Sequence, residues 1–191
     1  MAVEVRAATE FEDVCTMVGP KRPDASVCWC LSYRLSSKEN RSLTGPARGD
    51  RMRQLVDQGP PGVLAYEGDQ VVGWAAVAPR SETSFARSRV IPHVDDLDVW
   101  SIFCLRVRPG HRKAGIAHHL LEGAVRFAED SGAPAVEGYP LDNRGDRIDS
   151  TMAYVGTVGL FEAAGFVKAS DTTSVLDGFP RVLMRKAIPH P

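Results

Sequence analysis

The alternation of hydrophobic and polar residues along the chain predicts strands and helices in a mixed order. Residues 99–107 form a nearly continuous apolar run, which is typical of a central strand that is covered on both faces. Residues 114–130 place apolar side chains at helical spacing and predict the clearest amphipathic helix. Further strands are expected over residues 3–7, 62–67, 70–79, 135–139, 166–169 and 181–187, and further helices over residues 11–18, 47–58 and 157–164. This order predicts a single α+β (mixed α/β) domain over residues 1–191.

Two stretches near the N-terminus carry weaker patterns. Thr9 precedes the first expected helix and has Glu12 three residues later, which predicts a capping box at this helix start. Residues 20–45 show no clear periodicity and are rich in Ser, Arg and turn-forming residues. We therefore expect this stretch to be irregular, with one aromatic island, Cys-Trp-Cys-Leu, at residues 28–31.

Charge and cysteine content exclude several classes of protein. The 191 residues include 23 Lys and Arg against 24 Asp and Glu, a formal net charge of -1, so nothing draws the whole chain to nucleic acid or to a membrane surface. Because there is no run of ~18 apolar residues and no N-terminal basic region followed by an apolar core, we expect neither a transmembrane helix nor a secretory signal. The 4 cysteines are too few for a disulfide framework. These features favour a cytoplasmic protein with a local site for a small ligand.

The segment that joins the apolar strand to the amphipathic helix predicts an anion site. A Pro-Gly turn at residues 109–110 is followed by Arg112, Lys113 and Gly115, and the helix then begins with small residues. The first N–H groups of a helix have no intrahelical partner, and the helix dipole favours negative charge there. An ordinary solvated loop with basic side chains is the common alternative. The small residues, which let a backbone approach a ligand closely, favour a phosphate-bearing ligand.

The same segment resembles a hallmark of the GCN5-related N-acetyltransferase (GNAT) family. Residues 112–117, Arg-Lys-Ala-Gly-Ile-Ala, match the family's Gln/Arg-x-x-Gly-x-Gly/Ala loop, and residues 160–166, Leu-Phe-Glu-Ala-Ala-Gly-Phe, match its later Leu-Tyr/Phe-Glu-x-x-Gly-Phe signature. The resemblance implies a central, mostly antiparallel sheet with a parallel splayed pair, flanked by helices. It also implies transfer of an acetyl group from acetyl-CoA to the amine of a small molecule or peptide, by direct attack of the amine on the thioester.

The resemblance further implies which residues hold the cosubstrate. The CoA pyrophosphate would lie on the N–H groups of residues 112–117, and the pantetheine arm would follow the strand edge at residues 105–107. Charge-assisted hydrogen bonds contribute roughly 1.5–3 kcal/mol each and the helix end roughly 0.3–1 kcal/mol more, so backbone geometry rather than one lysine would carry the binding. The implied acetyl-CoA-binding residues are Leu105, Arg106, Val107, Arg112, Lys113, Ala114, Gly115, Ile116 and Ala117.

The residues available for proton transfer depart from common members of the family. Many members carry a tyrosine where this chain has Phe161, and some carry a glutamate where it has Ser101. Glu137 is our candidate base, because burial on a mostly apolar strand would strengthen its hold on a proton; a solvent-facing carboxylate is an equal alternative. Tyr154 is the candidate acid, although such a tyrosine is more often a packing residue. Proton transfer through solvent, with positioning as the main contribution, is the remaining route.

Three aromatic residues are candidates for the acceptor pocket. Trp29 and Tyr33 follow the first helix, where members of the family build their substrate wall. Tyr139 shares a strand face with Glu137, because residues two apart in a strand point the same way. These positions predict an aromatic acceptor site near the candidate base.

Two other functions are compatible with the sequence. A protein of this fold could bind acyl-CoA as a sensor without turnover, which Phe161 and Ser101 favour. A metal or redox protein built on Cys28 and Cys30 is the other, but zinc-binding cysteines are usually about two to four residues apart and need a second ligand pair, so we expect no metal. The expected partners are acetyl-CoA and an amine, without nucleic acid or membrane, and a homodimer is compatible with the sequence.

Overall fold

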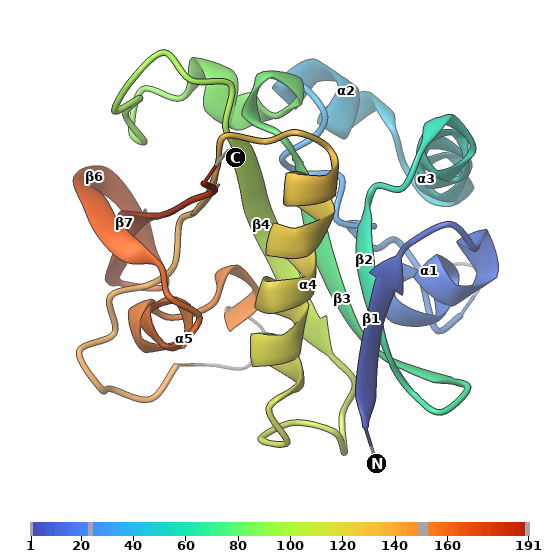
Figure 1. Cartoon of the computed structure of the whole chain (residues 1–191). Coiled ribbons are helices and arrows are strands. Elements are labelled where there is room, and N and C mark those ends of the chain that lie inside the picture. The colour runs from blue at the N-terminus through green and yellow to red at the C-terminus, as the bar shows by residue number, and fades with distance from the viewer. Residues whose placement is uncertain (1, 23–24, 149–152, 190–191) are drawn as a thin grey trace.

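Figure 1 shows the computed structural model of the chain, which describes residues 2–22, 25–148 and 153–189. Within these residues the strands are β1 (Val3–Ala7), β2 (Gly62–Glu67), β3 (Gln70–Pro79), β4 (Trp100–Val107), β5 (Ala135–Gly138), β6 (Val167–Leu176) and β7 (Phe179–Ala187). The helices are α1 (Phe11–Val18), α2 (Ser37–Ser42), α3 (Pro46–Gln58), α4 (Ile116–Asp130) and α5 (Val158–Ala163), with the short 3-10 helices η1 (Arg80–Glu82), η2 (Ser84–Arg87) and η3 (Ala153–Val155). The strands form one sheet in the order β1-β2-β3-β4-β5-β7-β6.

Helices cover both faces of this sheet (Figure 1). On one face, α4 lies across β1 to β4, and its apolar stripe, which includes Ile116 and Leu120, packs in a core with residues of β2 and β3. On the other face, Val14 of α1 and Met52 of α3 pack in a second core with Trp74 of β3. Both faces of β4 are therefore covered, which explains why a central strand carries a continuous apolar run.

β4 and β5 form the parallel pair of the sheet. Their pairing runs from Trp100–Val136 to Ile102–Gly138, where β5 ends. β4 continues, and residues 103–107 have no strand partner on that side among the described residues. The other strand pairs within the described chain are antiparallel. The prediction of a mixed α+β fold with a splayed parallel pair is confirmed.

A β-bulge in β4 decides which core each side chain of this strand reaches. The pairing with β3 steps from Ile102 to Cys104 over adjacent β3 residues, so Phe103 is an extra residue in β4. An extra residue interrupts the alternation of side chains between the two faces of a sheet. Phe103 and Cys104 consequently lie in the same core, on the α1 side, whereas Ile102 and Leu105 lie in the α4 core.

The helix starts near the N-terminus differ from the sequence prediction. α1 begins after Glu10, whose side chain makes no capping hydrogen bond, so the capping box predicted at Thr9 is wrong; the helix starts one residue too late for that motif. A capping box does begin α2, where Ser36 accepts from the Glu39 N–H and the Glu39 carboxylate accepts from the Ser36 N–H. α2 lies in a stretch expected to be irregular. It buries none of its side chains, so no apolar periodicity revealed it.

The last two strands are longer than predicted. β6 lies at the edge of the sheet and pairs with β7 alone, and most of its side chains are exposed or half-buried. A strand with an exposed edge and few buried side chains needs no apolar run. The pattern therefore indicated a strand over residues 166–169 only, which overlaps the first residues of β6.

Candidate active site

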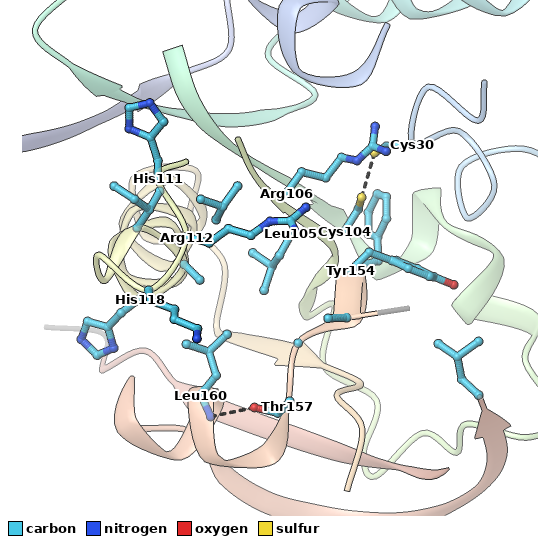
Figure 2. A pocket seen from close by; sticks show the side chains of 18 of the residues that line it. Cys30, Cys104, Leu105, Arg106, His111, Arg112, His118, Tyr154, Thr157 and Leu160 are labelled. Carbon is cyan, nitrogen blue, oxygen red and sulfur yellow. Dashed lines mark hydrogen bonds between the residues drawn. The ribbon is translucent and has the colours of Figure 1, made fainter. Parts of the chain in front are cut away.

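A cavity of about 1070 Å³ opens beside the separated strands β4 and β5 (Figure 2). Its wall consists of the second half of β4, the loop that leads into α4, residues that follow α1, and η3 with the start of α5. We call one part the loop end, lined by His111, Arg112, Lys113 and Gly115. We call the other part the aromatic end, lined by Cys30, Tyr33, Phe103, Cys104 and Tyr154.

The loop end is shaped by the backbone before α4. Gly115 has a φ of 80° and is the N-cap of α4, and a Cβ atom added there would meet nothing within 4 Å. Gly115 also lines the cavity, so this unobstructed backbone lies at the cavity wall. Glycine adopts this left-handed conformation without steric cost, and a side chain would occupy the space in front of the helix start. The first N–H groups of α4 are therefore close to the cavity, as an anion site requires.

Side chains add positive charge to this end. Arg112 and Lys113 line the cavity, and Lys113 also has a left-handed backbone, with a φ of 65°. His111 is held in place by Glu67, since its Nδ1 lies 2.7 Å from the Glu67 Oε2. The N–H of Arg108 donates to the carbonyl of Val72 over 2.9 Å. The loop is thus anchored to the β2–β3 hairpin at two points.

The wall between the two ends is the free half of β4. Leu105, Arg106 and Val107 line the cavity in the part of β4 that has left β5. β3 pairs with one side of this half, and the other side, which has no neighbouring strand among the described residues, can pair its backbone groups with an extended ligand. This edge is therefore suited to an amide-bearing chain that runs from the loop end to the aromatic end.

The aromatic end contains a chain of hydrogen bonds. The Tyr33 and Tyr154 hydroxyl oxygens lie 3.2 Å apart, and Arg181 Nη1 donates to the Tyr33 hydroxyl over 3.4 Å. Because a guanidinium only donates, the Tyr33 oxygen accepts from Arg181, whereas either hydroxyl can be the donor between Tyr33 and Tyr154. Tyr154 itself lines the cavity. Burial, and secondly the hydrogen bond with Tyr33, raise the pKa of Tyr154 above its ordinary value of 10.0.

Most of the residues expected at the cosubstrate site lie on this cavity. The lining residues among them are Leu105, Arg106, Val107, Arg112, Lys113, Gly115, Ile116 and Ala117. Ala114 is exposed on the same loop and does not line the cavity. Of the expected proton-transfer and acceptor residues, Tyr154 and Tyr33 line the cavity.

Glu137 lies outside the cavity, in a buried ion-pair cluster. Its carboxylate is fully buried and lies 2.8 Å from Arg80 Nη1 and 2.7 Å from Arg185 Nη2. It also accepts from the Tyr139 hydroxyl over 3.2 Å. A carboxylate that is held by two guanidinium groups and does not line the cavity is poorly placed to take a proton from a substrate. The structure therefore argues against the predicted role of Glu137 as base.

The two other acceptor candidates are packing residues. The Trp29 ring stacks beside Phe11, with 6.0 Å between ring centroids, and contacts Gly49. The Tyr139 hydroxyl is buried in a hydrogen bond with Ser101 Oγ, 2.8 Å away. Neither side chain lines the cavity, so the structure does not bring them to the acceptor site.

Sequence reasoning missed other residues of the aromatic end. Cys104 is a buried core residue, and the bulge in β4 also brings it to the cavity beside Phe103. Arg181, on a strand far along the chain, had no motif to mark it. In the described ranges, no group of three or more His, Cys, Asp or Glu residues could hold a metal ion, and no helix is long and apolar enough to cross a membrane.

Comparison with solved structures shows the fold. The chain is similar to the NatC complex bound to Gag peptide and CoA (14% identity, TM-score 0.54, covering 99% of this chain and 100% of that chain). It is similar to an acetyltransferase of the GNAT family from Bacillus cereus (14% identity, TM-score 0.55, covering 100% of this chain and 100% of that chain). It is also similar to mosquito arylalkylamine N-acetyltransferase like 5b (14% identity, TM-score 0.56, covering 98% of this chain and 100% of that chain).

Comparison at the level of sequence identifies the family. No curated protein sequence matched the chain. Residues 30–143, more than half of the chain, match the family model described as "Acetyltransferase (GNAT) family". This range contains β4, the loop end of the cavity and α4. The chain therefore belongs to the GNAT family of acetyltransferases.

Proposed function

We propose that this domain, over residues 1–191, transfers the acetyl group of acetyl-CoA to the amine of a small molecule or peptide. The observation that carries the proposal is one cavity that joins the start of α4, the free edge of β4 and the Tyr33–Tyr154 pair. These three parts match the three needs of the reaction: an anion site, a track for an extended arm, and a proton donor. The acceptor binds at the aromatic end.

The loop end fits the phosphate groups of CoA. Gly115 leaves open space before α4, and Arg112 and Lys113 supply positive charge beside it. Charge-assisted hydrogen bonds from N–H groups to phosphate contribute roughly 1.5–3 kcal/mol each, and the helix dipole adds about 0.3–1 kcal/mol. Residues 105–107 then offer backbone groups to the pantetheine arm.

Tyr154 would donate the proton that the reaction needs. Acetyl-CoA supplies the thioester that the amine attacks, and the sulfur leaves as the carbon–sulfur bond breaks. Tyr154 holds a proton at its hydroxyl oxygen, because its raised pKa keeps the neutral form at ordinary pH. Tyr33 and Arg181 are positioning residues, since Tyr33 hydrogen-bonds the Tyr154 hydroxyl and Arg181 hydrogen-bonds Tyr33. This assignment replaces the donor that Phe161 cannot provide.

The proton of the amine leaves by another route. Glu137 does not line the cavity, so the amine gives its proton to solvent. Holding the amine beside the thioester is then the main contribution of the acceptor site, because orientation alone lowers a bimolecular barrier substantially. Tyr33 and Phe103, whose ring centroids lie 6.0 Å apart, form the wall of the acceptor site that would hold the amine.

A non-catalytic acyl-CoA sensor is the second candidate. One observation favours it: the described residues that line the cavity include neither Asp nor Glu, so they offer no carboxylate base. Such a protein would use the loop end as proposed and would leave the aromatic end without a reaction.

Purified protein incubated with acetyl-CoA and a panel of amines separates the two candidates. The panel should contain arylalkylamines, amino acids, polyamines and peptides, and free CoA should be measured by chromatography, because the 4 cysteines of the chain react with thiol dyes. We expect CoA release and an acetylated product with at least one class of amine. Tight CoA binding with no release above the amine-free control across the panel would instead establish the sensor.

A further inference from the structure

Two cysteines of the aromatic end have their sulfur atoms side by side. Cys30 Sγ and Cys104 Sγ lie 2.8 Å apart, although 74 positions separate them in the chain (Figure 2). Both are free thiols, both residues are largely buried, and both line the cavity. The pair differs from the Cys28–Cys30 pair that the sequence suggests, because Cys28 is exposed and its Sγ contacts Ser32 Oγ at 3.0 Å.

Two irregular pieces of backbone bring these thiols together. Trp29 and Cys30 both have left-handed backbones, with φ values of 52° and 51°, and the Leu31 N–H donates to the Cys28 carbonyl over 3.1 Å. Residues with side chains rarely adopt this conformation. On the other side, the bulge at Phe103 turns Cys104 toward the core that contains Cys30. Regular alternation in β4 would have placed Cys104 in the opposite core with Ile102.

The surroundings give the two thiols different acidities. The hydrogen bond with Cys104 is the main cause that lowers the pKa of Cys30, and the Arg106 guanidinium, drawn beside it in Figure 2, and Trp74 lower it further. The buried Nε1–H of Trp74 has no ordinary hydrogen-bond partner in the described chain, so a thiolate nearby is favourable. The same hydrogen bond and burial raise the pKa of Cys104. These directions, together with the Arg106 guanidinium beside it, favour Cys30 as the nucleophile of the pair.

We propose that Cys30 and Cys104 form a redox-active dithiol site in the cavity wall, which a peroxide converts to a disulfide. The Cys30 thiolate attacks one peroxide oxygen, the O–O bond breaks, and Cys30 becomes a sulfenic acid while hydroxide leaves and takes a proton. The Cys104 sulfur then attacks the Cys30 sulfur, the S–O bond breaks, and water leaves with the Cys104 proton. Two thiols are oxidised to one disulfide and one peroxide is reduced to two waters.

This reaction is separate from acetyl transfer. It uses neither Tyr154 nor the loop end, and it needs no acceptor amine. Failure of the dithiol test would therefore leave the proposed acetyltransferase activity standing, and failure of that activity would leave the dithiol. The disulfide would tie the segment after α1 to β4 at the aromatic end.

The test treats the reduced, folded full-length protein with a small excess of hydrogen peroxide, blocks the remaining thiols with an alkylating reagent, and records intact mass and peptide maps. We expect the labelled cysteines to fall from 4 to two in the main species. We expect one cross-linked peptide that joins Cys30 to Cys104, and its loss after treatment with dithiothreitol. Because the readout is taken on the unmodified sequence, it does not depend on any variant folding.

Variants sharpen the test. Cys30→Ser and Cys104→Ser should each abolish the cross-link, whereas Cys15→Ser and Cys28→Ser should retain it; Cys15 is the matched control because its thiol pKa is raised by burial. A disulfide between Cys28 and Cys30, oxidation confined to exposed Cys28, or four labelled cysteines after peroxide would each overturn the proposal.

Discussion

The two ends of the cavity are built in different ways. The loop end comes from one short stretch of chain, residues 111–115, which carries two cationic side chains and leads directly into the first N–H groups of α4. The aromatic end comes from distant parts of the chain: 121 positions separate the hydrogen-bonded Tyr33 and Tyr154, and 148 separate Tyr33 and Arg181. The comparison teaches that the part proposed to bind CoA is a local motif, whereas the part proposed to do the chemistry exists only in the folded sheet.

Gly115→Glu would disrupt the loop end and should have the largest effect. The new carboxylate would fill the space before α4 and repel phosphate. Losing two charge-assisted hydrogen bonds of roughly 1.5–3 kcal/mol each corresponds to a fall of about 10²–10⁴-fold in CoA affinity. Calorimetric titration with CoA measures this.

Gly68→Glu is the matched control for that variant. Gly68 also has a left-handed backbone, with a φ of 60°, and open space around its Cα, but it lies in the β2–β3 turn outside the cavity. Its substitution should leave CoA affinity unchanged. Equal loss of affinity in both variants would mean that added charge or backbone strain, not the loop end, caused the effect.

Glu137→Gln tests whether Glu137, which lies outside both ends of the cavity, is needed for turnover or only for stability. It would leave Arg80 and Arg185 facing an uncharged amide in a buried site, and removing one partner of such a cluster typically costs about 3–5 kcal/mol. We expect the free energy of unfolding, measured with urea, to fall by about this amount. Turnover of the folded fraction should stay near that of the wild type.

Glu4→Gln is the control for burial. Glu4 also pairs with an arginine, Arg6, but the pair is exposed, so we expect no measurable change in stability. If Glu137→Gln kept full stability and lost turnover, Glu137 would return as the candidate base.

Tyr154→Phe tests the aromatic end. It removes the hydroxyl and keeps the ring, so turnover should fall by about 10²-fold, the low end of what a positioned acid contributes. CoA affinity should not change, because the loop end is intact. Steady-state kinetics with a responsive amine, together with calorimetry, separate the two quantities.

The pH profile and a second tyrosine check the same assignment. Because the pKa of Tyr154 is raised above 10.0, its hydroxyl stays protonated and turnover should not fall through its ionisation below about pH 10. A loss at lower pH that disappears in Tyr154→Phe would contradict this. Tyr66→Phe is the control, since the Tyr66 hydroxyl donates to Asp13 over 2.8 Å outside the cavity and its removal should not change turnover.

Lys113→Asn should have the smallest effect and tests what holds the ligand at the loop end. Asparagine tolerates the left-handed backbone at this position, where φ is 65°, so the loop keeps its shape and loses one charge. CoA affinity should fall less than about tenfold, or ~1.4 kcal/mol. Lys21→Asn, at a residue that does not line the cavity, should change nothing. A fall as large as that of Gly115→Glu would show that charge, not backbone geometry, dominates.

Local patterns along the chain predicted much of the fold. The apolar run of β4, the amphipathic stripe of α4 and the β2–β3 hairpin appear close to where the pattern indicated them. Each of these elements buries enough side chains to impose a period. α2 and most of β6 were missed because they bury few side chains. The prediction that Thr9 caps α1 was wrong. A capping motif shows only where a helix could start, whereas the packing of α1 determines where it does start.

The sequence by itself determined the loop end, because the proposed anion site at a helix start depends on neighbouring residues and on the backbone freedom of Gly115. Only the tertiary structure decided the rest. The bulge at Phe103 brought Cys104 to the cavity, the sheet order brought Arg181 behind Tyr33, and two arginines held Glu137 in a buried cluster. These outcomes depend on which strands are neighbours and on where their register slips. The hydrophobic pattern along the chain shows which side chains of a strand point to the same face of the sheet. It carries no information about which distant strands pair with that strand.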